Sequence, residues 1–312
     1  MNRRGSVILA LIGVGILLGS ACTPGSNPQS KGPDDPGEIQ PIVVGSFDFS
    51  ESRILAEVYA AALEHHGYPV KRLSKVASRE IMEPALDQEF VDLVPEYQGT
   101  ALAFLSRGGA PAALVPQATH ALLAEALGPR GITVLDFASA QDRNEVVVAR
   151  STADRLGVET ISELQDVASE MVLGGPPECP GRPLCLQGLE DVYGLDFEAF
   201  LPLDAGGPLT VAALEGGEID VAILFTTSPA ILAKDFVVLE DDLHLQPAEN
   251  VVPIVREQIL DLHGPELAHL LNSVTARLST RTLRELNRRV ELEGEDPAAV
   301  ARDWLDHEGL DR

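Results

Sequence analysis

The sequence predicts an α/β protein with largely parallel sheets. Short apolar segments typical of strands alternate with amphipathic helical segments along most of the chain. The chain has 312 residues, of which 45% are hydrophobic, so it is long enough for two ordinary domains and a sizeable core. A helix-then-strand unit in the first half also has a counterpart with the same spacing in the second half. Together these observations indicate two similar α/β halves.

The N-terminus has the features of an export signal. Arg3 and Arg4 precede an apolar stretch at 7–18, which is short for a membrane span, and three small residues then lead to Cys22. A cysteine in this place resembles a bacterial lipoprotein signal, although a glycine stands where an aliphatic residue is usual. We therefore expect residues 1–22 to be a signal peptide and Cys22 to be lipidated, on the extracytoplasmic side of the cell membrane. An ordinary secreted protein is the alternative.

Residues 23–40 are rich in Pro, Gly, Ser and Asp, and they contain no aliphatic residue before Ile39. Such a segment cannot bury a core, so a flexible tether is expected there. Folding is expected to start near Pro41.

The remaining cysteines, Cys179 and Cys185, form an even pair in an oxidising compartment, which predicts a disulfide that fixes a small loop. A metal site is disfavoured because no histidine or further cysteine lies nearby.

The elements follow one another in a regular order from residue 41. Ser50 can cap a helix with one apolar face, and Gly67 ends that helix. Further helices are expected at 78–86, 119–127, 161–167, 209–214 and, with leucines at helical spacing, from 256 onward. Strands are expected at 41–46, 68–73, 90–94, 132–137, 145–150, 171–175, 200–204, 218–225 and 236–241.

One internal correspondence points to a binding site. Asp92 follows an Ala-Leu pair at a helix end, seven residues after the alanine, and Tyr97 comes five residues later; Asp220 and Phe225 repeat this spacing. Ligands of open α/β sheets bind beyond the carboxyl ends of strands. Tyr97 and Phe225 are therefore expected to face each other across a cleft, with a chance match of composition as the alternative.

Composition and motifs exclude several function classes. A formal net charge of −25 disfavours binding to nucleic acid. The chain has no GxxxxGK[ST] phosphate loop, no HExxH motif and no GxSxG elbow, so enzyme functions are disfavoured and an unrecognised hydrolase is a remote alternative. The acidic run at 240–242 is best explained as a solvated turn, and neither a metal nor a cofactor is expected.

Five segments resemble a known family. They lie at 45–70, 78–102, 174–197, 213–231 and 237–256. In this order they are similar to the substrate-binding proteins of osmoprotectant ABC transporters (OpuAC type), which bind glycine betaine, choline or proline betaine. The resemblance covers about 42–310, nearly the whole chain after the tether.

The resemblance implies a two-lobed clamshell, the type II periplasmic-binding-protein fold. Residues 41–139 with 246–312 would form one lobe and 140–245 the other, with a hinge near Asn144 and 239–242. Closure on the solute would create the form that a membrane permease recognises. The protein is thus expected to be a monomer that works with permease and ATPase subunits.

The family binds quaternary ammonium groups between aromatic rings and holds carboxylates with basic or amide donors. Tyr97 and Thr100 match the family's PEYxGT motif, and Arg182, four residues after Glu178, matches the arginine of its E-F-x-x-R motif. The ligand-binding residues expected on these grounds are Ser46, Phe47, Phe49, Tyr97, Gln98, Thr100, Asn144, Arg182, Phe225 and Thr226.

The chain also departs from the family pattern. Phe47 stands where a lysine is usual, and non-aromatic Leu186 and Val211 stand near the positions of the second-lobe tyrosines. These departures leave two alternatives open: a different set of aromatic residues around the ligand, or a different ligand, such as an uncharged aromatic compound. Three further alternatives stay open. Tyr97 could be a core residue, and Arg182 could form a surface ion pair. The protein could also be a lipoprotein that senses the solute without transporting it.

Overall fold

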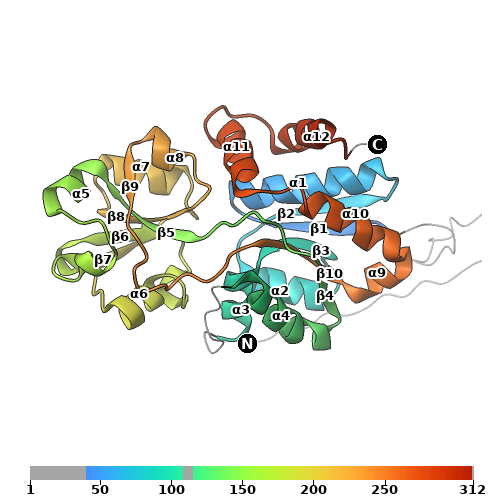
Figure 1. Ribbon diagram of the computed structural model, residues 1–312, viewed down its shortest axis with the longest axis horizontal. Helices are drawn as coiled ribbons and strands as arrows, with labels where there is room; N and C mark the ends of the chain where they lie inside the picture. The colour runs from blue at the N-terminus through green and yellow to red at the C-terminus, as the bar shows by residue number, and fades with distance from the viewer. Residues whose placement is uncertain (1–39, 108–114, 311–312) are drawn as a thin grey trace, which may run out of the picture. The chain divides into compact units, whose positions relative to one another are not determined.

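The computed structural model describes residues 40–107 and 115–310. These residues form two five-stranded mixed sheets covered by helices (Figure 1). The predictions for the signal peptide, Cys22 and most of the tether concern residues outside the described ranges.

The first sheet has the strand order β2-β1-β3-β10-β4. Its strands are β1 (Ile42–Phe47), β2 (Val70–Val76), β3 (Leu93–Tyr97), β4 (Ile132–Val134) and β10 (Val251–Arg256). Both β2 and β3 run parallel to β1, whereas β10 runs antiparallel to β3 and β4. Every residue of β3 and β10 is buried, which is typical of central strands covered on both faces.

Helices cover both faces of this sheet (Figure 1). One face carries α1 (Ser50–His65), α9 (Glu257–His263), α10 (Pro265–Thr275), α11 (Thr280–Glu291) and α12 (Pro297–Glu308). The other face carries α2 (Arg79–Asp87), α3 (Gln98–Leu105) and α4 (Pro116–Leu127). The apolar faces of these helices form two cores, one on each side of the sheet.

The second sheet repeats the same order as β7-β6-β8-β5-β9. Its strands are β5 (Asn144–Ala149), β6 (Val172–Gly175), β7 (Ala199–Pro202), β8 (Val221–Phe225) and β9 (Phe236–Val238). The helices around it are α5 (Arg150–Leu156), α6 (Leu186–Tyr193), α7 (Pro208–Gly216) and α8 (Ala230–Ala233). The central strands of the two sheets are therefore β3 and β8.

The structure corrects two expectations. The sheets are mixed rather than largely parallel, because β10 and β5 enter after the chain has crossed from the other sheet and run antiparallel to their neighbours. The helix expected at 161–167 is replaced by the short 3-10 helices η2 (Ser162–Leu164) and η3 (Ala168–Glu170). Asp242 accepts the Ser162 N–H at 3.2 Å, which ties this segment to the turn after β9. The sequence pattern also does not predict strand β10 or the helices α3, α5, α6 and α8.

The chain crosses between the sheets twice, at 135–143 and at 239–250 (Figure 1). The two crossings lie side by side, because Gln141 and Asn250 form an antiparallel bridge and Asp142 N donates to Glu249 O at 3.0 Å. Backbone hydrogen bonds thus tie together the two connections.

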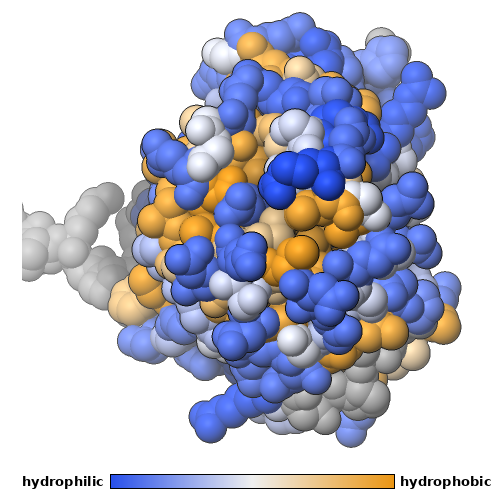
Figure 2. Space-filling view, turned by 90° about the vertical axis from the view of Figure 1, so that its left-hand side faces the viewer, coloured by the Kyte–Doolittle hydropathy of each residue, from blue (hydrophilic) through white to orange (hydrophobic). Residues whose placement is uncertain are grey.

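The surface of the second-sheet half shows apolar patches separated by hydrophilic residues (Figure 2). Scattered apolar side chains of this kind are normal on a folded protein. Among residues 40–107 and 115–310, no helix is both long and apolar enough to cross a membrane.

Candidate functional site

A cavity, here called the central cavity, lies between the ends of β3 and β8 and is lined from both sheets and from the first crossing. Its volume of about 110 Å³ is several times what one water molecule needs, so a small organic solute fits. Residues that line it include Phe47, Phe49, Arg79, Tyr97, Thr100, Phe104, Asp142, Asn144, Arg182 and Phe225.

The two central strands begin in the same way. Asp92 accepts the N–H of Val43 at 2.8 Å, and Asp220 accepts the N–H of Val172 at 2.9 Å. Each aspartate therefore joins a central strand to the start of the neighbouring parallel strand. The internal correspondence in the sequence reflects this repeated structure, and its two aromatic residues line one cavity.

Four aromatic rings gather at the centre of the site. The Phe49 ring centroid lies 6.2 Å from that of Phe47, 6.0 Å from that of Tyr97 and 5.5 Å from that of Phe225. Three of these rings come from the first sheet and its connections, and Phe225 comes from the second. The separations are within the range of aromatic contacts, so the rings form one connected cluster.

Arg79 stands beside this cluster. Its guanidinium donates to both Glu96 oxygens, at 2.9 and 2.7 Å, and lies 5.1 Å from the Phe47 ring centroid. The bidentate pair fixes the plane of the guanidinium. Arg79 thus brings a fixed positive charge to the cavity wall.

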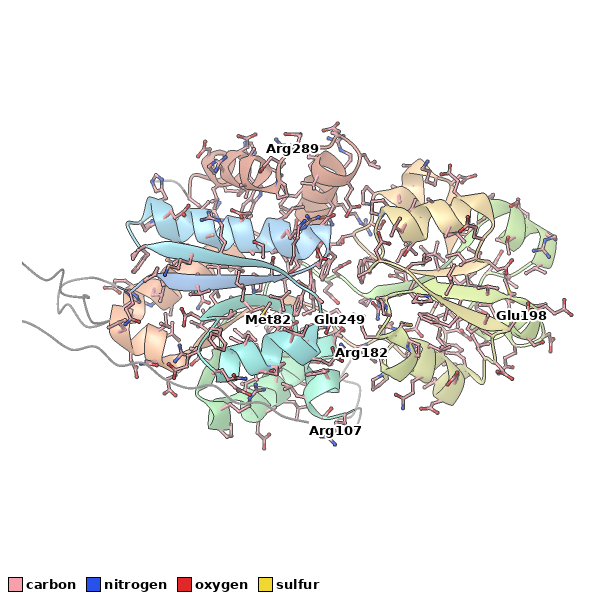
Figure 3. All side chains as sticks on the ribbon, turned by 180° about the vertical axis from the view of Figure 1, so that it is seen from behind. Met82, Arg107, Arg182, Glu198, Glu249 and Arg289 are labelled. Carbon is pink, nitrogen blue, oxygen red and sulfur yellow. A yellow bond between two sulfur atoms is a disulfide. The ribbon has the colours of Figure 1, made fainter. Side chains whose placement is uncertain are left out.

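Arg182 carries an unsatisfied donor. Its Nη2 donates to Glu80 at 2.9 Å and its guanidinium lies 4.8 Å from the Phe104 ring centroid, but its buried Nη1 has no partner among the described residues. Burial and the nearby Arg79 lower the pKa of Arg182 from its usual value. Because a buried unpaired donor is costly, an anionic group in the cavity would be stabilised here. Figure 3 shows Arg182 where the first-sheet elements face the second sheet.

A buried carboxyl network lies behind Tyr97. The Tyr97 hydroxyl donates to Glu51 Oε1 at 2.8 Å, and Asn287 donates to Glu51 Oε2 at 2.6 Å. The Thr227 hydroxyl lies 2.6 Å from Glu51 Oε2 and 2.8 Å from Asp142 Oδ1. Burial raises the pKa of Glu51, and burial together with Glu51 raises that of Asp142 well above its usual range. The network connects α1 and α11 with the first crossing and the end of β8.

The residues after Tyr97 hold the second crossing. Gln98 donates to the Asn250 side chain at 3.2 Å, Gly99 N donates to Glu249 at 3.1 Å, and the Thr100 hydroxyl donates to the other Glu249 oxygen. A Cβ on Gly99 would lie only 2.5 Å from Pro247, so this position requires glycine. Burial raises the pKa of Glu249 to about 7.

Seven of the ten predicted ligand residues line the central cavity, namely Phe47, Phe49, Tyr97, Thr100, Asn144, Arg182 and Phe225. The other three do not line this cavity, and their polar atoms bond elsewhere. Ser46 is buried and accepts the N–H of Lys75, Gln98 bonds to Asn250, and the Thr226 hydroxyl donates to Glu145. Leu186 and Val211, which stand near the positions of the family's second-lobe tyrosines, are not among the lining residues.

Sequence reasoning missed several residues of the site. Arg79 is the first residue of α2, and no motif in the sequence singles out Arg79, Phe104, Asp142 or Glu51. Arg79 lies three residues after the end of β2, and Asp142 precedes β5 by two residues, so position relative to strand ends was the available signal. Glu51 lies in the first turn of α1, where an acidic residue normally needs no special explanation.

A disulfide joins Cys179 and Cys185, as the cysteine pair predicted. The bridge closes the loop that carries Arg182, and both cysteines line the central cavity. It therefore restrains the backbone on both sides of the arginine. Among the described residues no group of three His, Cys, Asp or Glu side chains could hold a metal ion.

The chain is similar to several known binding proteins. The glycine-betaine-binding protein of Pseudomonas aeruginosa is 28% identical over 288 residues, covering 88% of this chain and 90% of that protein. The carnitine transport binding protein OpuCC of Listeria monocytogenes is 24% identical over 294 residues, covering 93% and 91%. A crystal structure described as a glycine betaine/carnitine/choline ABC transporter is similar, with a TM-score of 0.68, 25% identity and coverage of 87% and 100%.

The fold is that of the type II binding proteins among the solved structures. A lactococcal OpuAC in its closed, glycine betaine-bound form has a TM-score of 0.64 at 17% identity, over 87% of this chain and 98% of that one. The family described as the substrate binding domain of the ABC-type glycine betaine transport system matches residues 40–307. The chain therefore belongs to this family, as a substrate-binding protein of an ABC transporter.

Proposed function

We propose that the central cavity binds a small zwitterionic quaternary ammonium solute such as glycine betaine. One observation carries this proposal: a cluster of four rings and a buried arginine with an unpaired donor line the same cavity between the two sheets. A betaine has the two matching groups, a methylated cation and a carboxylate.

In this proposal the ammonium group lies among Phe47, Phe49, Tyr97 and Phe225. A desolvated cation against aromatic faces gains about 2 kcal/mol, and phenylalanine and tyrosine rings both supply this attraction, though less strongly than tryptophan. The solute carboxylate accepts from Arg182 Nη1, which then has its missing partner. Asp142 adds a carboxyl group near the cation site.

The capture step is a closure of two lobes, 41–139 with 246–312 and 140–245, about the two crossings. This closure is supported by the contact between Phe49 of the first lobe and Phe225 of the second lobe at the cavity. The closed protein then delivers the solute to a membrane permease driven by an ATPase. Ligand binding is non-covalent in this scheme.

The protein is further proposed to be held at the outer face of the membrane by a lipid on Cys22. Its support is the sequence pattern before that cysteine. Replacing Cys22 with serine is expected to move the protein from the membrane fraction to the soluble fraction. Retention of the variant in the membrane fraction would contradict lipid anchoring at this residue.

Calorimetric titration with glycine betaine, choline and carnitine tests the solute class. Phe225→Ala is expected to weaken betaine binding at least tenfold, which corresponds to about 1.4 kcal/mol. Phe90→Ala is a matched control, because Phe90 is 65% exposed and does not line the cavity. Equal affinities of the two variants, or no binding of any of the three solutes at millimolar concentration, would refute the proposal.

A further inference from the structure

Two buried carboxyl groups, those of Glu51 and Asp142, meet at the contact between the two sheets. Glu51 lies in the first turn of α1, and Asp142 lies in the first crossing. The hydroxyl of Thr227, two residues after the end of β8, lies 2.6 Å from Glu51 Oε2 and 2.8 Å from Asp142 Oδ1. None of the three residues is more than 6% exposed. Glu51 and Asp142, here called the carboxyl pair, are thus joined to the second sheet through one hydroxyl.

The geometry of the carboxyl pair requires a proton. Both distances to the Thr227 hydroxyl are hydrogen-bond distances, but a hydroxyl has one hydrogen and can donate to only one of the two groups. An ionised carboxylate only accepts hydrogen bonds, so two ionised groups would leave one contact without a hydrogen between its oxygen atoms. If the other carboxyl group is protonated, it donates to the hydroxyl and both contacts are satisfied.

The donors that surround the carboxyl pair are neutral. Glu51 accepts from the Tyr97 hydroxyl at 2.8 Å and from the Asn287 amide at 2.6 Å, and Asp142 accepts from the Thr227 N–H at 3.0 Å. Among the residues that the structure describes, no arginine, lysine or histidine forms an ion pair with either carboxyl group. The titratable and charged groups that face the pair from neighbouring elements are Tyr97 and Glu96 of β3, Glu291 of α11, Arg53 of α1, Arg143 of the first crossing and Asp204 of the loop before α7.

A movement of the two sheets away from each other would take this proton site apart, because Thr227 would leave Glu51 and water would reach both carboxyl groups. In water, Asp and Glu side chains ionise at about pH 4. Where the contact is formed, burial raises the pKa of Glu51, and burial together with Glu51 raises that of Asp142. A group whose pKa is higher in the closed form stabilises that form at low pH, and this stabilisation is lost as pH rises through the closed-form value.

We propose that the carboxyl pair is a proton site that fills when the lobes close, so that the protein takes up one proton with each solute molecule. This inference rests on the proposed function, because the solute drives the closure. With one proton bound, the pair keeps one negative charge, and Asp142 lines the central cavity, so the solute cation retains a counter-charge. Uptake of one proton makes the dissociation constant rise about tenfold per pH unit, from the pH at which the open form ionises to the pH at which the closed form does.

Calorimetric titration with glycine betaine at pH 6 tests the inference, because this solute has no group that titrates near that pH. The titration is repeated in phosphate, MES and Bis-Tris buffers, which differ in ionisation enthalpy. The slope of the observed enthalpy against the buffer ionisation enthalpy gives the number of protons taken up. The wild-type protein is expected to take up at least half a proton per bound solute, whereas Glu51→Gln and Asp142→Asn are each expected to take up less than about one fifth.

Glu291→Gln is the matched control. Burial raises the pKa of Glu291 to about 7, so this carboxyl group also titrates in the relevant range, but it lies outside the carboxyl pair. The control variant is expected to keep an uptake of at least half a proton. Loss of the uptake in Glu291→Gln, with uptake retained in both variants of the carboxyl pair, would place the proton on α11 and overturn the inference.

Binding of glycine betaine to the wild-type protein without proton uptake, or with proton release, would overturn the inference while the proposed function stands. Because this outcome is measured on the wild-type protein, it decides the question even if one of the variants does not fold. If glycine betaine does not bind at all, the proposed function itself fails, and this inference fails with it.

Discussion

Tyr97 has two separate roles in one side chain. Its ring lines the central cavity, while its hydroxyl donates to buried Glu51 and points into the carboxyl network. The ring is therefore available to a solute, whereas the hydroxyl stabilises the folded protein. Different substitutions of Tyr97 can therefore separate an effect on solute binding from an effect on stability.

Tyr97→Phe is expected to preserve solute affinity within about twofold and to lower the free energy of unfolding by about 1–3 kcal/mol, because Glu51 loses a hydrogen-bond donor. Tyr97→Ala is expected to reduce both quantities. Calorimetric titration and urea unfolding of the same preparations measure them. An affinity loss in Tyr97→Phe as large as in Tyr97→Ala would show that the hydroxyl, not the ring, contacts the solute.

Glu249 makes stability depend on pH. Its pKa is raised from 4.5 to about 7 by burial, so between these values the folded state binds more protons than the unfolded state. The free energy of unfolding therefore falls as pH rises across this interval. At 1.36 kcal/mol per pKa unit, the ionisation of Glu249 lowers the free energy of unfolding by about 3 kcal/mol across this interval.

Urea unfolding at pH 4.5 and pH 7.5 measures this contribution. Glu249→Gln is neutral at every pH and retains an oxygen acceptor, so it is expected to gain about 3 kcal/mol relative to the wild-type protein between these two values. Glu198→Gln serves as the control, since Glu198 is exposed and far from the crossings (Figure 3). A constant difference between wild type and Glu249→Gln would contradict the buried, protonated state.

At the scale of elements, the turn from β3 into α3 connects the central cavity to the second crossing. Tyr97 reaches the cavity, while Gln98, Gly99 and Thr100 bond to Glu249 and Asn250. The carboxyl end of one strand thus positions both a ring that lines the cavity and a connection between the sheets. Movement of the crossing must therefore be coupled to this turn.

Gly99→Ala is expected to destabilise the protein by about 1–3 kcal/mol, because the new Cβ would lie 2.5 Å from Pro247 and 2.8 Å from the Ala248 carbonyl oxygen. Gly216→Ala at the end of α7 is the matched control, since nothing lies within 4 Å of its added Cβ. Urea unfolding compares the two variants. Equal stability of Gly99→Ala and wild type would mean that the crossing does not pack closely on the turn.

The sequence was sufficient to predict the alternation of elements and the equivalence of β3 and β8, because buried strands leave continuous apolar runs. It was not sufficient for β10, whose antiparallel pairing depends on a chain that returns from the other sheet. The site was also predictable only in part. The positions of Tyr97 and Phe225 at the ends of β3 and β8 were predictable from their repeated spacing. The Glu51 and Asp142 contacts were not, since residues 91 positions apart meet only through the tertiary fold.

At the scale of the whole molecule, two sheets of identical strand order contribute to one cavity. A solute that fills this cavity contacts elements of both sheets at once. Its binding free energy therefore opposes their separation as well as local unfolding. The two crossings are the segments that must bend when the sheets move.

Hydrogen–deuterium exchange with saturating glycine betaine tests this arrangement. Amide protection is expected to increase in peptides that contain the β3–α3 turn of the first sheet and the 182–186 loop of the second. The Phe225→Ala variant at the same solute concentration is expected to show less protection in both. Protection confined to peptides of one sheet would contradict capture between two lobes.

The most direct test of the account is a crystal structure of the protein bound to glycine betaine. The predicted result is a solute in the central cavity, with its trimethylammonium group among Phe47, Phe49, Tyr97 and Phe225 and its carboxylate on Arg182 Nη1. A solute bound outside this cavity, or one that contacts residues of a single sheet only, would contradict it.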